Sequence, residues 1–169
     1  MMHTEHHLRD EFYNAITHGL GALLSIIGGI VLITLAAIYG NQWQLISAVI
    51  YSISLVGLYG ASTLYHSTHE PIAKRRYKVL DHCMIYVLIA GSYTPFTLIA
   101  MRDDGGWWLF GISWSMALAG IVFKLFFTGR FELVSTLLYL GMGWMMLFAA
   151  GPMLRNIGTG FYVTELIGH

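Results

Sequence analysis

Between Glu11 and Glu70 the sequence contains no Asp, Glu, Lys or Arg. A helix that crosses the hydrocarbon core of a bilayer needs only about 20 apolar residues, so this uncharged stretch is long enough for two crossings. Because lipid offers no hydrogen-bond partner to backbone N–H and C=O groups, the crossings must be helical. The stretch therefore predicts two transmembrane helices, at Thr17–Tyr39 and Trp43–Tyr65.

Three more apolar stretches follow, at Val79–Met101, Trp107–Phe127 and Leu133–Leu154. Hydrophobic residues make up 56% of the 169 residues and charged residues only 11%, and the mean hydropathy of +0.63 exceeds that of a soluble domain. We predict an all-α fold, a polytopic transmembrane bundle with five helices in this chain. Residues 1–16 would form a cytoplasmic amino-terminal segment, residues 17–154 the transmembrane domain, and residues 155–169 an extracytoplasmic carboxy-terminal segment.

Several other classes of protein fit the sequence poorly. The first residues, MMHTEHHLRDEFYN, are mixed in charge and lead into an apolar stretch too long for a cleavable signal peptide. The net charge of zero gives no support to nucleic-acid binding. The single cysteine, Cys83, has no intramolecular partner for a disulfide, and its apolar surroundings predict a packing residue. The expected partners are membrane lipids, and a homo-oligomer is left open.

The distribution of Lys and Arg predicts the orientation. With the amino terminus in the cytoplasm, the outer segments contain only Arg102 and Arg155. The inner segments then contain the other cations, Arg9, Lys74, Arg75, Arg76, Lys78, Lys124 and Arg130. This asymmetry follows the positive-inside rule, so we expect a multi-pass protein of the plasma membrane with a cytoplasmic amino terminus.

In this topology four titratable side chains lie at one membrane depth. His18 is at the inner end of the first predicted helix, His66 at the inner end of the second, and Asp81 and His82 at the inner start of the third. Polar groups at the edge of the hydrocarbon are costly unless they face the interior of the bundle, which makes them candidates for function. The alternative is that each histidine is merely interfacial.

Sequence spacing adds further candidates. Ser62 and His66 are four residues apart, so they share a helix face, although a membrane serine also commonly bonds its own i−4 carbonyl. Glu11 and Asn14 continue a polar face toward His18, with an ordinary capped helix start as the alternative. Small residues extend the same face and predict close helix packing, namely Gly21, Ser25 and Gly29.

Several spaced motifs together resemble a known family. They are Glu11-x-x-Asn14-x-x-Thr17-His18-x-x-Gly21, Ser62-x-x-x-His66, and Leu80-Asp81-His82 followed by Ala90-Gly91-Ser92-Tyr93-Thr94-Pro95. The sequence resembles the haemolysin III-related branch of the progestin and adipoQ receptor (PAQR) family, whose members have seven helices and a zinc site near the cytoplasmic face. The resemblance implies that His66 is a zinc ligand, that Asp81 holds the zinc-bound water, and that Ser62 lies beside that water or the substrate carbonyl.

One part of the family pattern is not found. The family completes its zinc site with an H-x-x-x-H motif on its last helix, whereas after Leu154 this chain reads RNIGTGFYVTELIGH. We therefore expect the chain to correspond to the first five of seven helices, with an incomplete set of zinc ligands. His18, His69 or His82 would have to replace the missing histidines.

The resemblance implies a zinc-dependent hydrolase of lipid amides or esters, similar to a ceramidase. An alternative mechanism without metal makes Ser62 the nucleophile and His66 its base. Alternatives without catalysis are a pore-forming haemolysin, which would cause cytolysis, and a membrane protein that resembles a receptor. The clustering of polar residues at one membrane depth favours a site over a pore.

Overall fold

The computed structural model describes residues 2–127, 133–145 and 147. This part of the chain is all-α, as the sequence predicts, and contains no strand. The long helices are α1 (Met2–Tyr39), α2 (Gln42–Ser67), α3 (Pro71–Pro95) and α4 (Trp107–Phe127). Two short π-helices, η1 (Phe96–Ala100) and η2 (Arg102–Gly106), join α3 to α4, and a shorter apolar helix spans Leu133–Met145.

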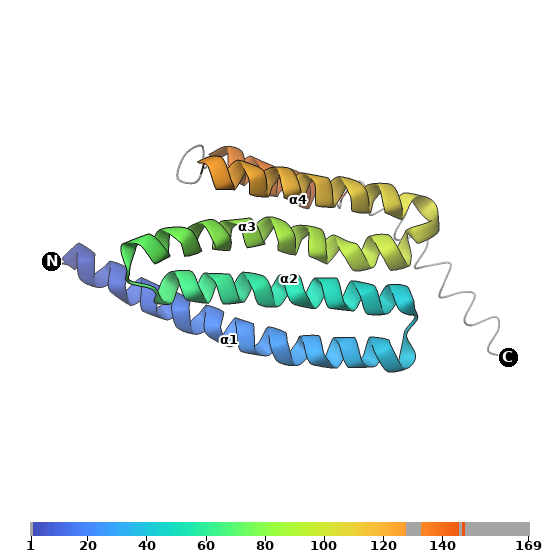
Figure 1. Cartoon of the computed structure of the whole chain (residues 1–169), viewed down its shortest axis with the longest axis horizontal. Helices are drawn as coiled ribbons and strands as arrows, with labels where there is room; N and C mark the ends of the chain where they lie inside the picture. Colours follow the sequence, from blue (N-terminus) through green and yellow to red (C-terminus); the bar gives the residue numbers. More distant parts are fainter. Residues whose placement is uncertain (1, 128–132, 146, 148–169) are drawn as a thin grey trace.

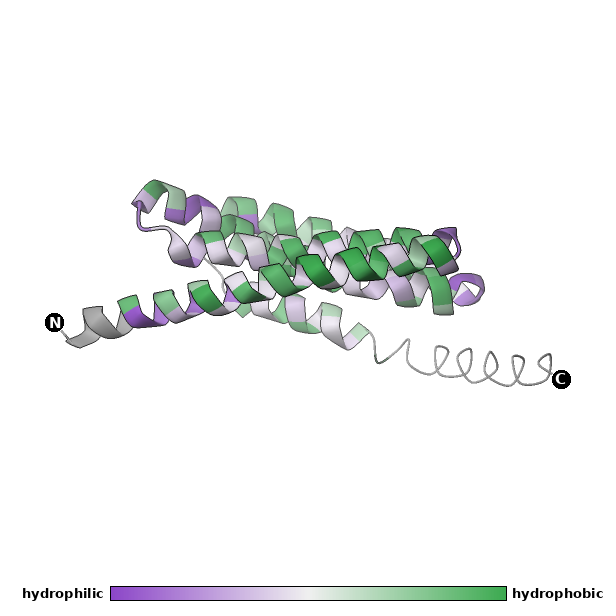
Figure 2. Cartoon of the chain, turned by 90° about the horizontal axis from the view of Figure 1, so that it is seen from below, coloured by the Kyte–Doolittle hydropathy of each residue, from purple (hydrophilic) through white to green (hydrophobic). Residues whose placement is uncertain are grey.

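The long helices run antiparallel in chain order, so that α1 packs on α2, α2 on α3 and α3 on α4 (Figure 1). The bundle therefore has two ends. We call the end where α2 finishes and α3 begins the histidine end, and the end where α1 finishes and α2 begins the tryptophan end. Figure 2 shows that hydrophilic residues gather toward both ends, while the middle of the helices is hydrophobic.

Four helices in the described part of the chain are long and apolar enough to cross a membrane. Their spans are Leu8–Tyr39, Gln42–Ser67, Pro71–Ala100 and Arg102–Phe127. Large apolar side chains cover the outside of these helices, including Leu24 and Ile30 on α1. A surface of this kind is stable in lipid and not in water, so the chain is a multi-pass membrane protein. The predicted spans within residues 17–127 are confirmed.

The helices α1 and α3 are longer than their apolar stretches at the histidine end. The helix α1 includes most of the predicted amino-terminal segment, so Glu11 lies well inside the helix and is not a helix start. The fifth predicted span is described only as Leu133–Met145 and residue 147. Its remaining residues, and the predicted carboxy-terminal segment 155–169, lie outside the described residues.

Side-chain caps explain where α2 and α3 begin. Asn41 accepts hydrogen bonds from the backbone N–H groups of Trp43 and Gln44, and the Gln44 side chain accepts one from the Asn41 N–H. This reciprocal capping box satisfies donors that the first turn of a helix leaves open. Glu70 caps α3 in a similar way and precedes Pro71, a residue suited to the first helical position.

Small residues let α1 approach α2 closely, as the sequence predicts. A Cβ atom at Gly21 would lie 2.7 Å from the ring of Tyr59, and one at Gly29 would lie 3.0 Å from the Cβ atom of Ser52. Ser25, between these glycines, donates a hydrogen bond to the Gly21 carbonyl. The contacts fix the separation of α1 and α2 just below the histidine end.

The main core lies among α3, α4 and the helix Leu133–Met145. Its fully buried members are Tyr86, Ala90, Ala117 and Met142. Tyr93 donates a hydrogen bond to the Met142 carbonyl at 2.6 Å, which ties the last described helix to α3. Cys83 is buried and free, in agreement with a packing residue.

Pro95 ends the regular part of α3, and the chain then widens into η1. The hydroxyl of Thr97 donates to the carbonyls of Tyr93 and Thr94 and stabilises this change of helix type. Asp103 and Asp104 are exposed in η2, at the tryptophan end.

Candidate active site

A histidine on α1 and a serine on α2 meet near the histidine end. The Oγ atom of Ser62 lies 2.6 Å from Nδ1 of His18. Ser62 is only 3% exposed, so this contact is inside the helix interface. When Nε2 of His18 carries the proton, Nδ1 accepts the hydrogen bond from the Ser62 hydroxyl. The pair thus presents a buried hydroxyl whose proton has a basic acceptor.

A second set of polar contacts, closer to the histidine end than this pair, joins three helices. His66 on α2 places Nδ1 at 3.1 Å from Oε2 of Glu11 on α1. Lys74 on α3 donates to the same carboxylate oxygen at 2.8 Å. Lys74 also donates to the carbonyls of Tyr65 and Thr68, at 3.3 Å each, where α2 ends. One carboxylate therefore holds α1, α2 and α3 together.

The two groups form one cluster, because the rings of His18 and His66 pack edge to face with centroids 5.6 Å apart. Aromatic rings cover both histidines, Tyr59 beside His18 and Tyr65 beside His66. We call the five residues that make the polar contacts the polar cluster, namely Glu11, His18, Ser62, His66 and Lys74. It is the place where α1, α2 and α3 bring ionisable and hydroxyl groups into contact.

Asp81 and His82 lie on α3 and form a separate contact. His82 donates from Nδ1 to the Lys78 carbonyl at 2.7 Å, and the same nitrogen lies 3.6 Å from Oδ2 of Asp81. The His82 carbonyl accepts a hydrogen bond from the hydroxyl of Tyr139. His82 is thus engaged with its own helix and with the helix Leu133–Met145.

Two other sequence candidates are exposed. Asn14 lies on the outside of α1, where its backbone carbonyl accepts a hydrogen bond from Thr17. His69 lies in the short connection between α2 and α3. The polar face predicted from Glu11 through Asn14 to His18 is therefore split, with Glu11 and His18 in the polar cluster and Asn14 on the surface.

The structure differs from the sequence interpretation in the partner of Ser62. Spacing placed Ser62 beside His66, and the metal-free alternative used His66 as its base. In the structure the hydroxyl contacts His18 instead, because α1 packs into the space beside Ser62. The sequence predicts Lys74 only as an inner cation, and no periodic pattern links it to Glu11. Their sequence separation, 63 residues, made this contact inaccessible to spacing arguments.

The polar contacts described above fit part of a metal site and not all of it. Among the described residues, no three His, Cys, Asp or Glu side chains are grouped so that they could hold a metal ion. The donor chemistry of His66 nevertheless fits one ligand position. Glu11 holds its Nδ1–H, and histidines that bind metals through Nε2 commonly donate the other ring N–H to a carboxylate. The described residues thus fit one part of a zinc site and not a whole one.

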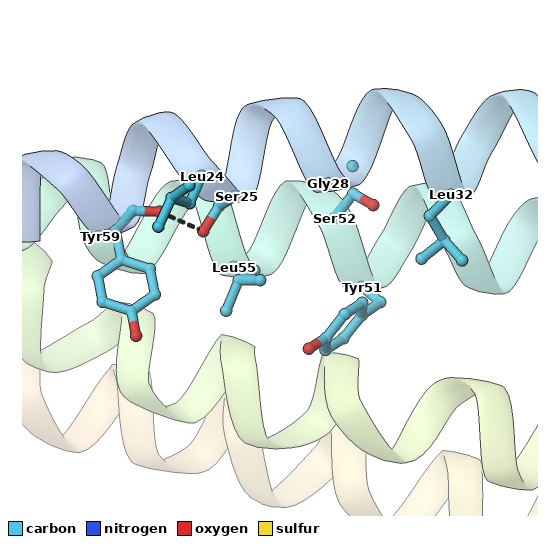
Figure 3. Close-up of a pocket in the computed structure, with 10 residues that line it drawn as sticks. Leu24, Ser25, Gly28, Leu32, Tyr51, Ser52, Leu55 and Tyr59 are labelled. Carbon is cyan, nitrogen blue, oxygen red and sulfur yellow. Dashed lines mark hydrogen bonds between the residues drawn. The ribbon is translucent and has the colours of Figure 1, made fainter.

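A mostly apolar cavity of about 620 Å³ is lined by residues of α1 and α2 (Figure 3), and no residue of the polar cluster is among them. Tyr59, which packs against His18, forms one end of the cavity, and Leu32 lies toward the other. The wall between them contains small and aliphatic residues together with Tyr51 and Ser52. Tyr59 therefore lies between the polar cluster and a space suited to a hydrocarbon chain.

The sequence matches the family described as haemolysin-III related over residues 6–167. Hemolysin-3 homolog of Bacillus subtilis (strain 168) is 47% identical over 162 residues, which cover 95% of this chain and 76% of the relative. Hemolysin-3 of Bacillus cereus is 46% identical over 155 residues, with coverage of 91% and 71%. Monocyte to macrophage differentiation factor of Homo sapiens is 27% identical over 141 residues, with coverage of 77% and 56%. No solved structure matches the chain.

Proposed function

The chain belongs to the haemolysin-III-related family, and from this premise we propose that it is a hydrolase of lipid amides or esters with ceramidase-like chemistry. The observation that carries the proposal is the 2.6 Å contact between Ser62 and His18, beside the Glu11–His66 pair. Buried hydroxyl, imidazole and carboxylate groups are the parts that acyl transfer requires. Structural stability alone gives little reason to place them together in an apolar bundle.

The Ser62 hydroxyl has two possible roles in hydrolysis. In the first, it donates a hydrogen bond to the oxyanion that forms when water attacks the substrate carbonyl. In the second, it attacks the carbonyl itself, and His18 takes its proton. The second role uses His18, which contacts Ser62, and not His66. We favour the first role because the contacts of His18 within the described residues are with Ser62, Tyr59 and His66, and include no carboxylate to orient it as a base.

The remaining residues of the proposed site position the reactants. Zinc, when bound, would supply a Lewis acid and a water whose pKa is near 7. His66 would offer Nε2 as one ligand, and Glu11 would fix the ring by accepting the Nδ1–H. Asp81, which lies on α3 outside the polar cluster, would accept a proton from the attacking water.

A lipid substrate is supported by the cavity beside the site. The space of about 620 Å³ starts at Tyr59 and runs between apolar side chains toward the middle of the helices. An acyl chain placed there would bring its carbonyl carbon toward Ser62 and His18. A water-soluble substrate would gain no binding energy from these apolar side chains. We therefore propose long-chain amides or esters that enter from the bilayer.

The proposed site would lie at the cytoplasmic side of a plasma membrane. The histidine end contains the run Lys74–Lys78, and the tryptophan end contains Arg102. An excess of cations marks the cytoplasmic side in multi-pass proteins. This orientation would place the reaction at the inner leaflet.

The test compares Ser62→Ala with Thr63→Ala, its neighbour on α2, whose hydroxyl donates to the carbonyl of Tyr59 in its own helix. Hydrolysis of a fluorescent ceramide and of a matched ester is measured in micelles, with this chain and with a form extended by the family's H-x-x-x-H helix. We expect Ser62→Ala to lower the rate by about 10²–10³-fold and Thr63→Ala to leave it unchanged. Equal rates in both variants, or hydrolysis by neither form, would refute the proposal.

The metal and the mechanism are tested by separate measurements. Elemental analysis should find about one zinc per extended chain and substoichiometric zinc in this chain, with loss of zinc in His66→Ala. Asp81→Asn should keep zinc and lose rate. Activity that survives a chelator, together with an acyl group trapped on Ser62, would favour the nucleophilic role instead.

A second candidate function is cytolysis, because the relatives from Bacillus bear the names Hemolysin-3 and Hemolysin-3 homolog. In this case several copies of the chain would assemble and permeabilise a membrane. Release of an encapsulated dye from lipid vesicles tests it. Dye release that persists in Ser62→Ala would show that lysis does not depend on the polar cluster.

A further inference from the structure

Another cavity lies on the opposite side of the bundle from α1, where α3 begins and α4 ends. Its volume is about 320 Å³. Two arginines and four apolar residues line it, namely Arg75, Arg76, Ile72, Val79, Leu125 and Phe126. The combination is unusual for this molecule, because the cavities beside α1 are lined by uncharged residues.

The two arginines are not used to hold the bundle together. Within residues 2–127, 133–145 and 147, neither guanidinium lies within ion-pair distance of a carboxylate, although the charge of Arg76 interacts with that of Glu70 at longer range. The neighbouring Lys74 has the opposite role, since it points to α1 and α2 and binds Glu11. Within one turn of α3, Lys74 therefore faces the interior of the bundle, whereas Arg75 and Arg76 face the cavity.

The apolar part of the cavity continues into the lipid-facing surface. Phe126 is 77% exposed, and Leu125 and Ile72 are also exposed. These side chains lie at the histidine end of helices that span the membrane, so the guanidinium groups are at the level of lipid headgroups while the apolar groups are next to the acyl chains. The cavity thus has a charged part at the level of the lipid headgroups and an apolar part next to the acyl chains.

We propose that this α3–α4 cavity binds an anionic phospholipid, with the headgroup phosphate on Arg75 and Arg76 and an acyl chain against Leu125 and Phe126. Guanidinium groups bind phosphate oxygens in a bidentate manner, and basic pockets between transmembrane helices are suited to anionic headgroups. The proposal is independent of hydrolysis, because none of these residues belongs to the polar cluster.

The apolar residues decide between a lipid and a soluble anion. A free phosphate would use the two arginines and leave Leu125 and Phe126 without a role. A phospholipid satisfies both parts at once, since its charge and its hydrocarbon are covalently joined. Two effects therefore favour binding of a phospholipid. Its headgroup binds the arginines, and its acyl chain is already at a high local concentration in the bilayer.

The test is native mass spectrometry of the purified chain in micelles that contain dioleoylphosphatidylglycerol or dioleoylphosphatidylcholine. We expect one phosphatidylglycerol to be retained in preference to phosphatidylcholine. The double variant Arg75→Gln/Arg76→Gln should lower this retention by about 20- to 30-fold, at about fivefold for each arginine. Val79→Trp, which fills the cavity and keeps both charges, should lower it to a similar extent. Circular dichroism confirms that each variant is folded.

Two controls make the result decisive. Arg9→Gln removes a cation of α1 at the same end of the bundle and should cost at most the fivefold effect of one surface charge. Glycerol 3-phosphate in millimolar excess should not displace the lipid. Retention unchanged in both cavity variants would overturn the proposal, as would an equal loss in Arg9→Gln. Displacement by glycerol 3-phosphate would show a simple anion site and would also refute it.

Discussion

Lys74 on α3 donates a 2.8 Å hydrogen bond to Glu11 on α1, so two helices that are not neighbours in the bundle order share a direct ion pair. Lys74 reaches across the end of α2, and His66 contacts the same carboxylate oxygen of Glu11. A pair of this kind is sensitive to the loss of either partner, because the remaining charge stays partly buried.

We expect Glu11→Gln to destabilise the protein by about 1–2 kcal/mol, since it removes a charged acceptor of both Lys74 and His66. Asp10→Asn is the matched control, because Asp10 is adjacent and exposed, and it should stay within about 0.5 kcal/mol of the parent. Unfolding in mixed micelles, followed by circular dichroism, measures both. A loss of stability in Asp10→Asn as large as that in Glu11→Gln would indicate a general effect of charge.

Two glycines on α4 give a second comparison. A Cβ atom at Gly120 would overlap the buried ring of Tyr86, whereas one at Gly111 would meet no atom within 4 Å. Gly120→Ala should therefore cost about 1–3 kcal/mol through overpacking, and Gly111→Ala should be neutral or slightly stabilising. The same unfolding measurement applies. Similar stabilities for the two variants would contradict the packing of α4 on α3.

The hydroxyl of Tyr93 anchors the helix Leu133–Met145 through the carbonyls of Met142 and Gly143. Tyr93→Phe removes this donor and should destabilise the protein by about 1 kcal/mol. Tyr13→Phe, on the exposed outside of α1, should have no effect. Hydrogen exchange near residue 142 should rise only in Tyr93→Phe, and an unchanged exchange rate would argue against the anchor.

Glu70 predicts a local dependence on pH at the start of α3. Hydrogen bonds from the N–H groups of Ala73 and Ile72 hold the pKa of Glu70 below its ordinary value of 4.5. Because the folded pKa is the lower one, the cap contributes fully above the unfolded value and is lost as the pH falls through the folded value. Protection of the Ile72 and Ala73 amides should decrease over this range. In Glu70→Gln the decrease should be absent.

The orientation is tested with cysteines introduced in a Cys83→Ser background. A membrane-impermeant maleimide should label Asp103→Cys in intact cells and His69→Cys only after permeabilisation. Both positions are exposed in connections at opposite ends of the bundle, so access to the reagent depends on topology. Labelling of His69→Cys in intact cells would reverse the proposed orientation and place the polar cluster at the outer leaflet.

Much of the fold follows from hydropathy alone, because the bilayer leaves helices as the only way to satisfy the backbone of apolar spans. The small residues Gly21 and Gly29 predicted close packing of this face, and the structure shows that α2 is the partner. The ends of the helices were harder to predict from the sequence, since α1 and α3 continue into polar sequence where hydropathy gives no signal. The burial of Lys124, only 2% exposed, was missed for a related reason. A charge count assigns a cation to one side of the membrane and does not tell whether its side chain faces the interior of the bundle.

The candidate site was predicted in part. Co-location of His18 and His66 followed from topology, and the structure confirms that their rings touch. The contact of Ser62 with His18 depends on how α1 is rotated about its own axis against α2. That rotation is set by packing across two helices and is not encoded in the spacing along either one. The same holds for the contact between Glu11 and Lys74.

The close approach at Gly21 and Gly29 has a consequence for how this protein can vary. The Ser62–His18 distance is set by glycine contacts farther along the same two helices, so a methyl group added to the apolar interface would alter the geometry of hydroxyl and imidazole without touching either. Residues that look like simple packing positions therefore act as spacers for the chemistry. In comparing related sequences, a substitution at Gly21 should be read together with the size of the side chain at Tyr59, as one coupled unit.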